Sequence, residues 1–187
     1  MPRTAEQPDA VHEAFLNLPE NIVGEILNGE LHTQPRPSPK HALAASYLGD
    51  DLVGPYGKGR GGPGGWWIID EPEIHLNGDI MVPDMAGWKK ERMPKLPETA
   101  FFGLAPDWVC EVLSLHTARK DRIEKMPLYA EYGVSHIWLI DPLIKTLEAF
   151  RLENGYWQLI GAFSEGNRVS VEPFQETMID LASLWEE

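Results

Sequence analysis

Two short apolar segments with a charged segment between them constrain the fold of this chain most. Residues 108–113 read Trp-Val-Cys-Glu-Val-Leu, residues 136–140 read His-Ile-Trp-Leu-Ile, and the intervening stretch around residues 119–125 is charged and helix-like. A strand, a helix and a second strand joined in this way form a crossover unit, whose strands run parallel in one sheet. The pattern therefore predicts an α/β fold with a mixed central sheet.

Turn and cap signals predict further elements around this unit. Asn28-Gly29 between two short apolar runs predicts a β hairpin, since both turn positions need positive φ. Ser38 followed by Pro39 predicts the start of a helix that reaches about Leu52. The other predicted elements are a helix over 9–18, strands over 66–69, 73–76 and 80–87, a helix that begins at an Asp121–Glu124 capping box and is disturbed by Pro127, and a terminal meander over 146–152, 156–163 and 168–171.

Length and composition favour a single globular domain over residues 1–187. The hydrophobic content is 43%, with 7 Trp and 6 Phe, which is typical of a folded protein with a substantial core. No apolar run approaches the roughly 20 residues that span a bilayer, and the first residues lack the apolar core of a secretory signal. The single cysteine, Cys110, lies in an apolar run and is expected to be a reduced, buried thiol. We therefore expect a cytoplasmic protein that has no membrane partner.

The charge balance argues against a protein that coats nucleic acid. The chain has 29 acidic and 16 basic residues, and its net charge is −13. Because this is the wrong sign for binding a polyanion, a nucleic-acid substrate would require a local basic strip, bound metal ions or a partner. The same balance counts less against catalysis, since carboxylates that hold a metal are themselves acidic.

Asp84 and Glu111 are the candidate acidic residues of a catalytic site. Asp84 follows a proline in strand-like sequence, a break that can aim a carboxylate into a cleft, although Pro-Asp also marks ordinary turns. Glu111 lies in an apolar run, where an unpaired carboxylate is costly and needs a cation, a metal or a donor. The alternatives for Glu111 are a structural ion pair and a strand position that faces solvent.

Lys125 is the candidate basic residue. It lies four residues after Asp121 and four before Tyr129, so the three share one helical face. Spacing alone favours a solvated Asp–Lys pair. Lys120 competes as the functional lysine because it is nearer the end of the Glu111 strand, although it is expected to lie outside the regular helix. Neighbouring strands lie roughly 4.8 Å apart, so carboxyl groups at adjacent strand ends can reach the same cations. The combination predicts a site for Mg²⁺ or Mn²⁺, which bind oxygen ligands.

A series of short motifs extends along most of the chain in one order. They occupy residues 24–31, 38–41, 82–84, 106–114, 121–125, 128–129, 132–134 and 136–142. In this order they resemble the Uma-type family of putative restriction endonucleases, within the PD-(D/E)XK nuclease superfamily. The resemblance implies a restriction-endonuclease-like αβββαβ core with a mixed central sheet, to which an N-terminal hairpin and a C-terminal β meander are added.

The resemblance also implies roles for individual residues. Asp84 and Glu111 correspond to metal ligands, with the backbone carbonyl of Val112 as a third. Lys125 corresponds to a lysine that the family carries on the following helix, whereas the superfamily's usual lysine position is Leu113 here. Residues that would add to the site, by the resemblance or by the shared helical face, are Glu25, His41 and Asp121.

The implied activity is that of a Mg²⁺- or Mn²⁺-dependent endonuclease that hydrolyses phosphodiester bonds, with DNA as the expected substrate and weak intrinsic affinity for it. The metal would activate a water, which Lys125 would orient for in-line attack. The histidines show no zinc-type spacing, and no GxSxG element is present. The alternative is a catalytically silent, nuclease-like scaffold for protein association, which the net charge and Leu113 also suit. Exposed strand edges and the aromatic C-terminal segment are compatible with a homodimer.

Overall fold

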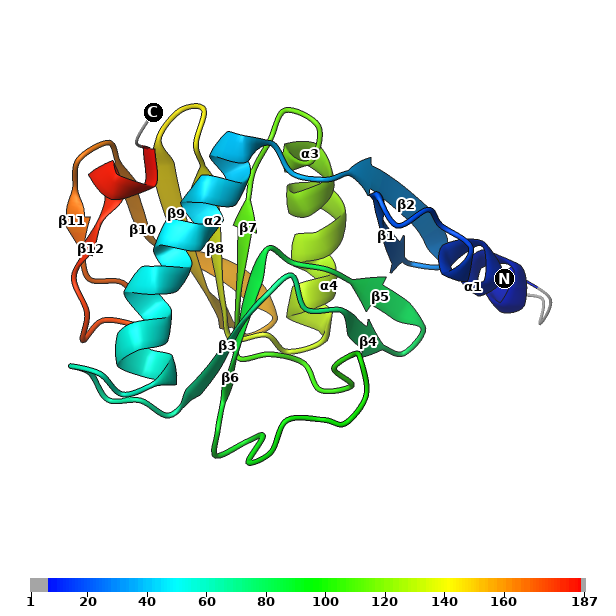
Figure 1. Cartoon of the computed structure of the whole chain (residues 1–187), viewed down its shortest axis with the longest axis horizontal. Helices are drawn as coiled ribbons and strands as arrows, with labels where there is room; N and C mark the ends of the chain where they lie inside the picture. Colours follow the sequence, from blue (N-terminus) through cyan, green and yellow to red (C-terminus); the bar gives the residue numbers. More distant parts are fainter. Residues whose placement is uncertain (1–6, 186–187) are drawn as a thin grey trace.

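The computed structural model describes residues 7–185, and two β-sheets with helices packed against them form its framework (Figure 1). The larger sheet has six strands in the order β10-β9-β8-β7-β6-β3, the smaller has four in the order β2-β1-β5-β4, and β11 pairs with β12. In chain order the elements are α1 (Gln7–Leu16), β1 (Ile22–Leu27), β2 (Glu30–Pro35), α2 (Pro39–Leu52), the π-helical turn η1 (Val53–Gly57), β3 (Trp66–Asp70), β4 (Ile74–Leu76), β5 (Asp79–Met81), β6 (Met85–Lys89), β7 (Trp108–Val112), α3 (Ala118–Lys120), the π-helical turn η2 (Asp121–Lys125), α4 (Met126–Glu131), β8 (His136–Asp141), β9 (Thr146–Glu153), β10 (Tyr156–Ser164), β11 (Arg168–Val169), β12 (Ile179–Asp180) and the 3₁₀ turn η3 (Leu181–Trp185).

The predicted crossover unit is present in the larger sheet. β7 and β8 run parallel, with Trp108 opposite His136 and Val112 opposite Ile140. The other neighbouring pairs in this sheet are antiparallel. The predicted α/β fold with a mixed central sheet is therefore confirmed.

The larger sheet separates two apolar cores. Successive residues of a strand face opposite sides, and Trp108, Cys110 and Val112 of β7 belong to the core that includes the buried face of α2. Val109 and Leu113 belong to the core that includes α4, so α2 and α4 cover opposite faces of the sheet (Figure 1). The same alternation places Glu111 on the α4 side.

The smaller sheet forms an arm beside the larger one, and α1 packs against it at the N-terminal end of the chain (Figure 1). The predicted hairpin is confirmed: β1 and β2 pair antiparallel, and Asn28 and Gly29 have φ of 54° and 79°. β5 pairs with β1 at Ile26 and Ile80, and the chain then passes through residues 82–84 into β6 of the larger sheet. The arm is thus joined to the body by the segment that contains Asp84.

Three details differ from the sequence prediction. The expected single strand over 80–87 is two strands in different sheets, because the chain changes sheet at Pro83. The helix begins at Ala118 rather than at a capping box on Asp121, and a π-helical turn precedes Pro127, which has no N–H to donate. The last part of the terminal meander does not extend the large sheet, since β11 pairs with β12.

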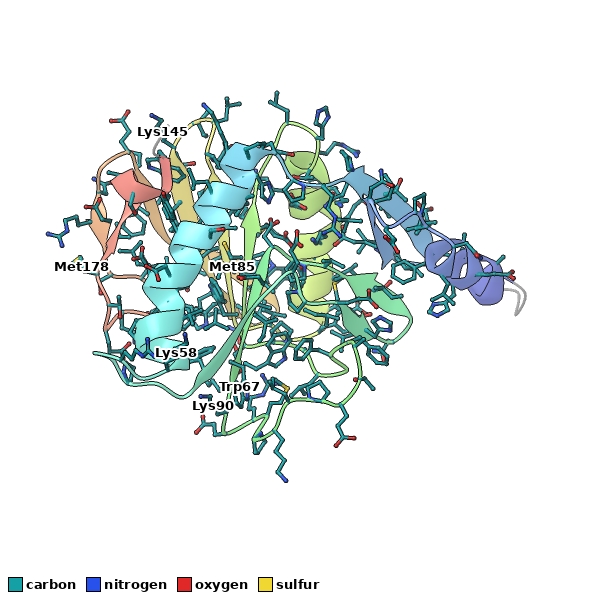
Figure 2. The ribbon with its side chains drawn as sticks, in the orientation of Figure 1. Lys58, Trp67, Met85, Lys90, Lys145 and Met178 are labelled. Atoms are coloured by element: carbon teal, nitrogen blue, oxygen red, sulfur yellow. The ribbon has the colours of Figure 1, made fainter. Side chains whose placement is uncertain are left out.

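The glycine-rich segment 57–65 lies at the end of the sheet where β3 begins and β6 ends. Lys90 Nζ donates a hydrogen bond to the carbonyl of Gly57 at 3.0 Å and lies 4.3 Å from the ring centre of Trp67, so the start of the segment is tied to β3 and to the end of β6. Lys58, Trp67 and Lys90 lie close together in this region (Figure 2). The segment therefore lies at the opposite end of β6 from Asp84.

None of the helices between residues 7 and 185 has the length and apolar character needed to cross a bilayer.

Cys110 provides a test of the packing around β7. Its side chain is buried, and burial, with smaller contributions from Asp84 and Glu111, holds the thiol pKa well above its ordinary value. We expect the native thiol to react with a disulfide reagent at least about a hundredfold more slowly than the thiol in denaturant, because only opening of the core exposes a reactive thiolate. Native and denatured labelling rates at one pH check this, and equal rates would contradict the buried position.

Candidate active site

Glu111 lies at the centre of a buried polar cluster on the α4 side of the larger sheet. Its side chain is 3% exposed, and its Oε1 accepts from Lys125 Nζ at 2.7 Å and from the hydroxyl of Tyr129 at 2.6 Å. Among contacts within residues 7–185, Oε2 accepts no hydrogen bond. The alternative in which Glu111 faces solvent is wrong, the alternative of an ion pair is present, and one carboxylate oxygen keeps both lone pairs available.

Lys125 is buried, so the solvated surface pair that spacing favoured is wrong. Its side chain is 1% exposed, and its ammonium group contacts Glu111, Glu25 Oε1 at 2.8 Å and the carbonyl of Val82 at 3.2 Å. An ammonium group has three N–H donors, and these three contacts use all of them. Lys125 therefore links β7, β1 and the segment that joins β5 to β6.

Glu25 brings a second carboxylate from the arm. It lies in β1, is fully buried, and accepts hydrogen bonds from Lys120 Nζ at 2.5 Å and from the amide of Val82 at 2.9 Å. Lys120 also donates to Gln34 Oε1 of β2 at 2.6 Å, and its side chain is partly accessible. Lys120 belongs to α3, which corrects the expectation that it lies outside the regular helix. Both candidate lysines are thus in the cluster.

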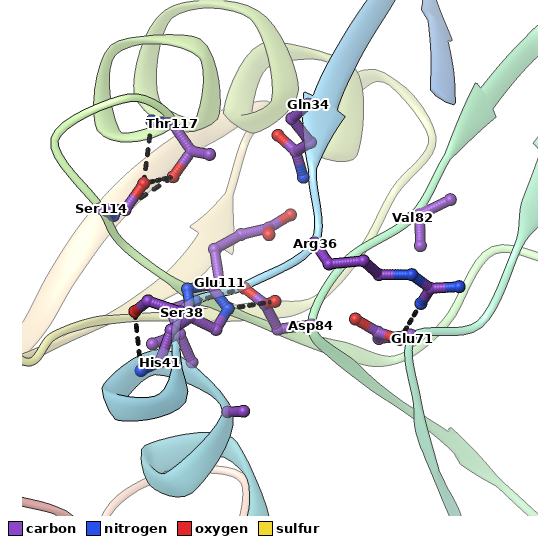
Figure 3. A network of polar contacts seen from close by, with 12 residues as sticks. Gln34, Arg36, Ser38, His41, Glu71, Val82, Asp84, Glu111, Ser114 and Thr117 are labelled. Carbon is purple, nitrogen blue, oxygen red and sulfur yellow. Dashed lines mark hydrogen bonds and ion pairs between the residues drawn. The ribbon is translucent and has the colours of Figure 1, made fainter. Parts of the chain in front are cut away.

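Asp84 lies where the chain passes from one sheet into the other. Met85, the first residue of β6, pairs with Cys110, so Asp84 lies just before the β6–β7 ladder, at the level of Glu111. Asp84 Oδ2 accepts from the amide of Val112 at 2.7 Å, and Oδ1 lies 2.6 Å from His41 Nε2 (Figure 3). His41 is held at the first turn of α2, where its amide donates to the N-cap hydroxyl of Ser38.

The cluster has more acid than base. Glu25, Asp84, Glu111 and Asp121 supply four carboxyl groups, and the opposing ammonium groups are those of Lys120 and Lys125. Burial raises the pKa of Glu111 to about 8, since Asp121, Asp84 and Glu25 add to the effect and Lys125 only partly offsets it. Burial likewise raises the pKa of Asp121, against the opposing effect of Lys125. The four acids therefore cannot all carry their charge at neutral pH without cost.

The pKa values of Glu25 and Lys125 shift in the directions that favour their charged forms. Burial disfavours the ionised form of Glu25, but the charges of Lys125 and Lys120 outweigh it and lower the pKa of Glu25. Burial also disfavours the charged form of Lys125, yet Glu111 and Glu25 hold its pKa well above the ordinary lysine value. Glu25 and Lys125 are therefore ionised at neutral pH, whereas Glu111, whose pKa is raised to about 8, is mostly protonated there.

The donor set of the cluster fits a hard divalent cation. Mg²⁺ is commonly held by one or two carboxylates and keeps several waters, so it does not require a complete protein cage. Within residues 7–185 no group of three or more His, Cys, Asp or Glu side chains forms such a cage. Among the residues that the structure describes, none donates to Glu111 Oε2, and each Asp84 oxygen has a lone pair left beyond its single contact there. The backbone carbonyl of Val112 lies on the same strand, directly after Glu111.

All residues that the sequence analysis proposed for the site gather in this region. They are Glu25, Asp84, Glu111, Val112, Lys125, His41 and Asp121, and Lys120 joins them. Sequence reasoning assigned no role to Tyr129, Gln34 or the Val82 backbone. For Tyr129 a signal was present, since it lies four residues after Lys125 on the same helical face. For Gln34 and Val82 no local signal exists, because their contacts depend on how the arm folds back.

Comparisons with known proteins agree with this architecture. Residues 12–182 match the family named Uma2, described as putative restriction endonuclease. The chain belongs to this family. A solved structure, that of a putative nuclease belonging to DUF820 from Anabaena variabilis ATCC 29413, is 24% identical, covers 92% of this chain and 96% of its own, and superposes with a TM-score of 0.73. Among curated proteins, none matches.

Lys125 is expected to be essential for stability. In Lys125→Met two carboxylates lose a buried cationic partner, which should cost about 3–5 kcal/mol of unfolding free energy. Adding Glu111→Gln to Lys125→Met should recover part of the loss, because it removes one of the uncompensated acids. Urea unfolding of both variants measures this, with the exposed Lys95→Met as the control. An effect of Lys125→Met as small as that of the control would show that the buried pairing contributes little.

Proposed function

We propose that this protein is a Mg²⁺- or Mn²⁺-dependent endonuclease that hydrolyses phosphodiester bonds of nucleic acid, with DNA as its substrate. The single observation that carries the proposal is the position of Asp84, directly before β6, next to Glu111 of the neighbouring strand β7, with a buried lysine on Glu111. Membership of a family described as putative restriction endonucleases supports it. The proposed cytoplasmic location and the homodimer stay predictions.

In the proposed mechanism, Asp84, Glu111 and the carbonyl of Val112 would hold the divalent ion. When bound, such an ion lowers the pKa of a coordinated water and offsets the charge of the phosphodiester. Tyr129 and Lys125 fix one oxygen of Glu111, which leaves the other oxygen for the ion. His41 and the Val112 amide fix the Asp84 carboxylate. These contacts hold the carboxylates in place before substrate arrives, as electrostatic catalysis requires.

The two lysines have different capacities in this scheme. All three N–H donors of Lys125 are engaged with Glu111, Glu25 and Val82, so Lys125 acts by holding Glu111 and by lowering the cost of its charge. Lys120 uses two donors, on Glu25 and Gln34, in the described part of the chain, and its side chain is more accessible. We therefore assign the contact with the attacking water or the phosphate to Lys120.

Cleavage of supercoiled plasmid tests the activity. We expect wild type to nick plasmid in Mg²⁺ or Mn²⁺, and Asp84→Asn and Glu111→Gln to lower the rate by on the order of a hundredfold or more, because each removes one anionic ligand. Lys120→Met should lower the rate without the stability loss of Lys125→Met. Melting curves confirm that each variant is folded, and Arg168→Gln, an exposed change in β11, is the control.

Two outcomes of the cleavage assay would count against the proposal. Nicking that persists in chelator or in both carboxylate variants would indicate a contaminating nuclease. Absence of both nicking and metal binding in the folded wild type would favour the silent scaffold for protein association instead.

Metal binding is measurable without substrate. A ligand that binds only the folded state raises the unfolding midpoint, so Mn²⁺ or Mg²⁺ at roughly ten times its dissociation constant should raise the midpoint of wild type by about 3–6 °C. The midpoint of Asp84→Asn should not rise, and chelator should reverse the wild-type shift. An equal shift in Asp84→Asn would place metal binding elsewhere.

A further inference from the structure

A cavity of about 290 Å³ lies where the arm meets the body, lined by residues of α1 and β1 and of the segments that follow β2, β3 and β5. Part of its wall is apolar and comes from Phe15, Leu18, Ile22 and Val23. The polar part comes from Arg36 together with Glu20, Glu71 and Glu73. Its volume is at the lower end of the range of small-ligand pockets, which is roughly 300–1,000 Å³.

The cavity shares its inner wall with the candidate active site. Val82 lines the cavity, while its amide donates to Glu25 and its carbonyl accepts from Lys125. Gly24 also lines it and directly precedes Glu25. The amide of Glu71 donates to the backbone carbonyl of Asp84 at 3.0 Å. A group bound in the cavity would therefore be one residue contact away from Lys125 and Glu25 and from the backbone of Asp84.

Arg36 is the cation at this junction, and its present contacts are long. Its guanidinium lies 3.4 Å from Glu71 Oε2 and 3.5 Å from the carbonyl of Glu20, and its side chain is 60% exposed. Figure 3 shows Arg36 directed to Glu71 on the side of Asp84 away from His41. A guanidinium binds a phosphate through two parallel hydrogen bonds, which are stronger than these contacts. Arg36 can therefore exchange Glu71 for a phosphate at low cost.

We propose that this cavity binds the nucleotide that flanks the scissile phosphodiester, and that Arg36 holds the phosphate of that nucleotide. The inference rests on the proposed function and specifies whether the nucleic-acid substrate is single-stranded or double-stranded. The apolar wall contacts the base, and the carboxylates at the rim accept hydrogen bonds from base N–H groups, as Glu and Asp do with cytosine. Glu71 holds Arg36 until the phosphate replaces it.

This arrangement favours a single-stranded substrate. A base inside a duplex is stacked and paired, so it enters a cavity only after it is unpaired, at a cost of a few kcal/mol. A single strand does not have to be unpaired and presents its bases directly. The net charge of −13 acts in the same direction, because a duplex has the higher density of negative charge.

Opposite effects of two substitutions test the proposal. Binding of a fluorescein-labelled single-stranded DNA oligonucleotide is measured by anisotropy in EDTA at low salt, and the duplex of the same sequence is measured beside it. We expect wild type to prefer the single strand and Arg36→Gln to weaken its binding about tenfold. Glu71→Gln should tighten binding severalfold because it releases Arg36, and this gain should disappear in the Arg36→Gln background. A pair with a merely structural role would lose affinity, or stay unchanged, in both single variants.

Further variants distinguish binding in the cavity from a general effect of positive surface charge on DNA affinity. Ile22→Trp, which fills the apolar side, should weaken single-strand binding while the protein stays folded, and Arg168→Gln, which removes an exposed arginine in β11, should leave binding unchanged. Equal effects of Arg36→Gln and Arg168→Gln, or a gain from Glu71→Gln that persists without Arg36, would overturn the proposal.

The plasmid assay separates failure of this inference from failure of the proposed function. If wild type nicks plasmid in Mg²⁺ but has no preference for single strands and no dependence on Arg36, only the cavity assignment is overturned. If wild type neither binds an oligonucleotide nor nicks plasmid, both are overturned.

Discussion

The ammonium group of Lys125 is the contact on which the rest of the site depends. It joins Glu111 of the larger sheet, Glu25 of the arm and the carbonyl of Val82 in the connecting segment. Because it is buried, its absence would take a cationic partner from both carboxylates and the side-chain donor from the Val82 carbonyl, and water could not replace it cheaply. One side chain therefore fixes both the position of the arm and the orientation of the glutamate.

The passage between the sheets explains why Asp84 lies at this site. A proline in the middle of a sheet removes a ladder hydrogen bond, and here Pro83 stands where the chain has left β5 and has not yet entered β6. The Asp84 carboxylate, rather than a backbone carbonyl, then accepts the amide hydrogen of Val112. Because the chain is irregular here, the Asp84 carboxylate lies at the end of the larger sheet, near Glu111.

Local patterns predicted much of the fold and the identity of the acids. Asn28-Gly29, the Ser38 cap and the parallel β7–β8 pair follow from turn chemistry and crossover geometry. The burial of the two lysines could not be predicted from local patterns, because helical spacing indicates which residues share a face but not what packs over that face. The cover over Lys120 and Lys125 comes from Glu25, which is 95 residues from Lys120 in sequence. The capping box on Asp121 was wrong for a related reason: Asp121 is buried in the cluster, and the helix begins earlier, at Ala118.

The residue types in the cluster are not those that stability alone would favour. Well-packed apolar side chains of similar volume in place of a buried ion network are often neutral or stabilising, since they avoid the desolvation of charge. This cluster instead buries more acids than lysines, and the ionised form of Glu111 is the one that is disfavoured, since its pKa is raised to about 8. A divalent cation beside Asp84 and Glu111 would supply the missing positive charge at the place where it is lacking. The energetic imbalance of the protein alone is thus a physical reason to expect a cation there, and it is independent of the family to which the chain belongs.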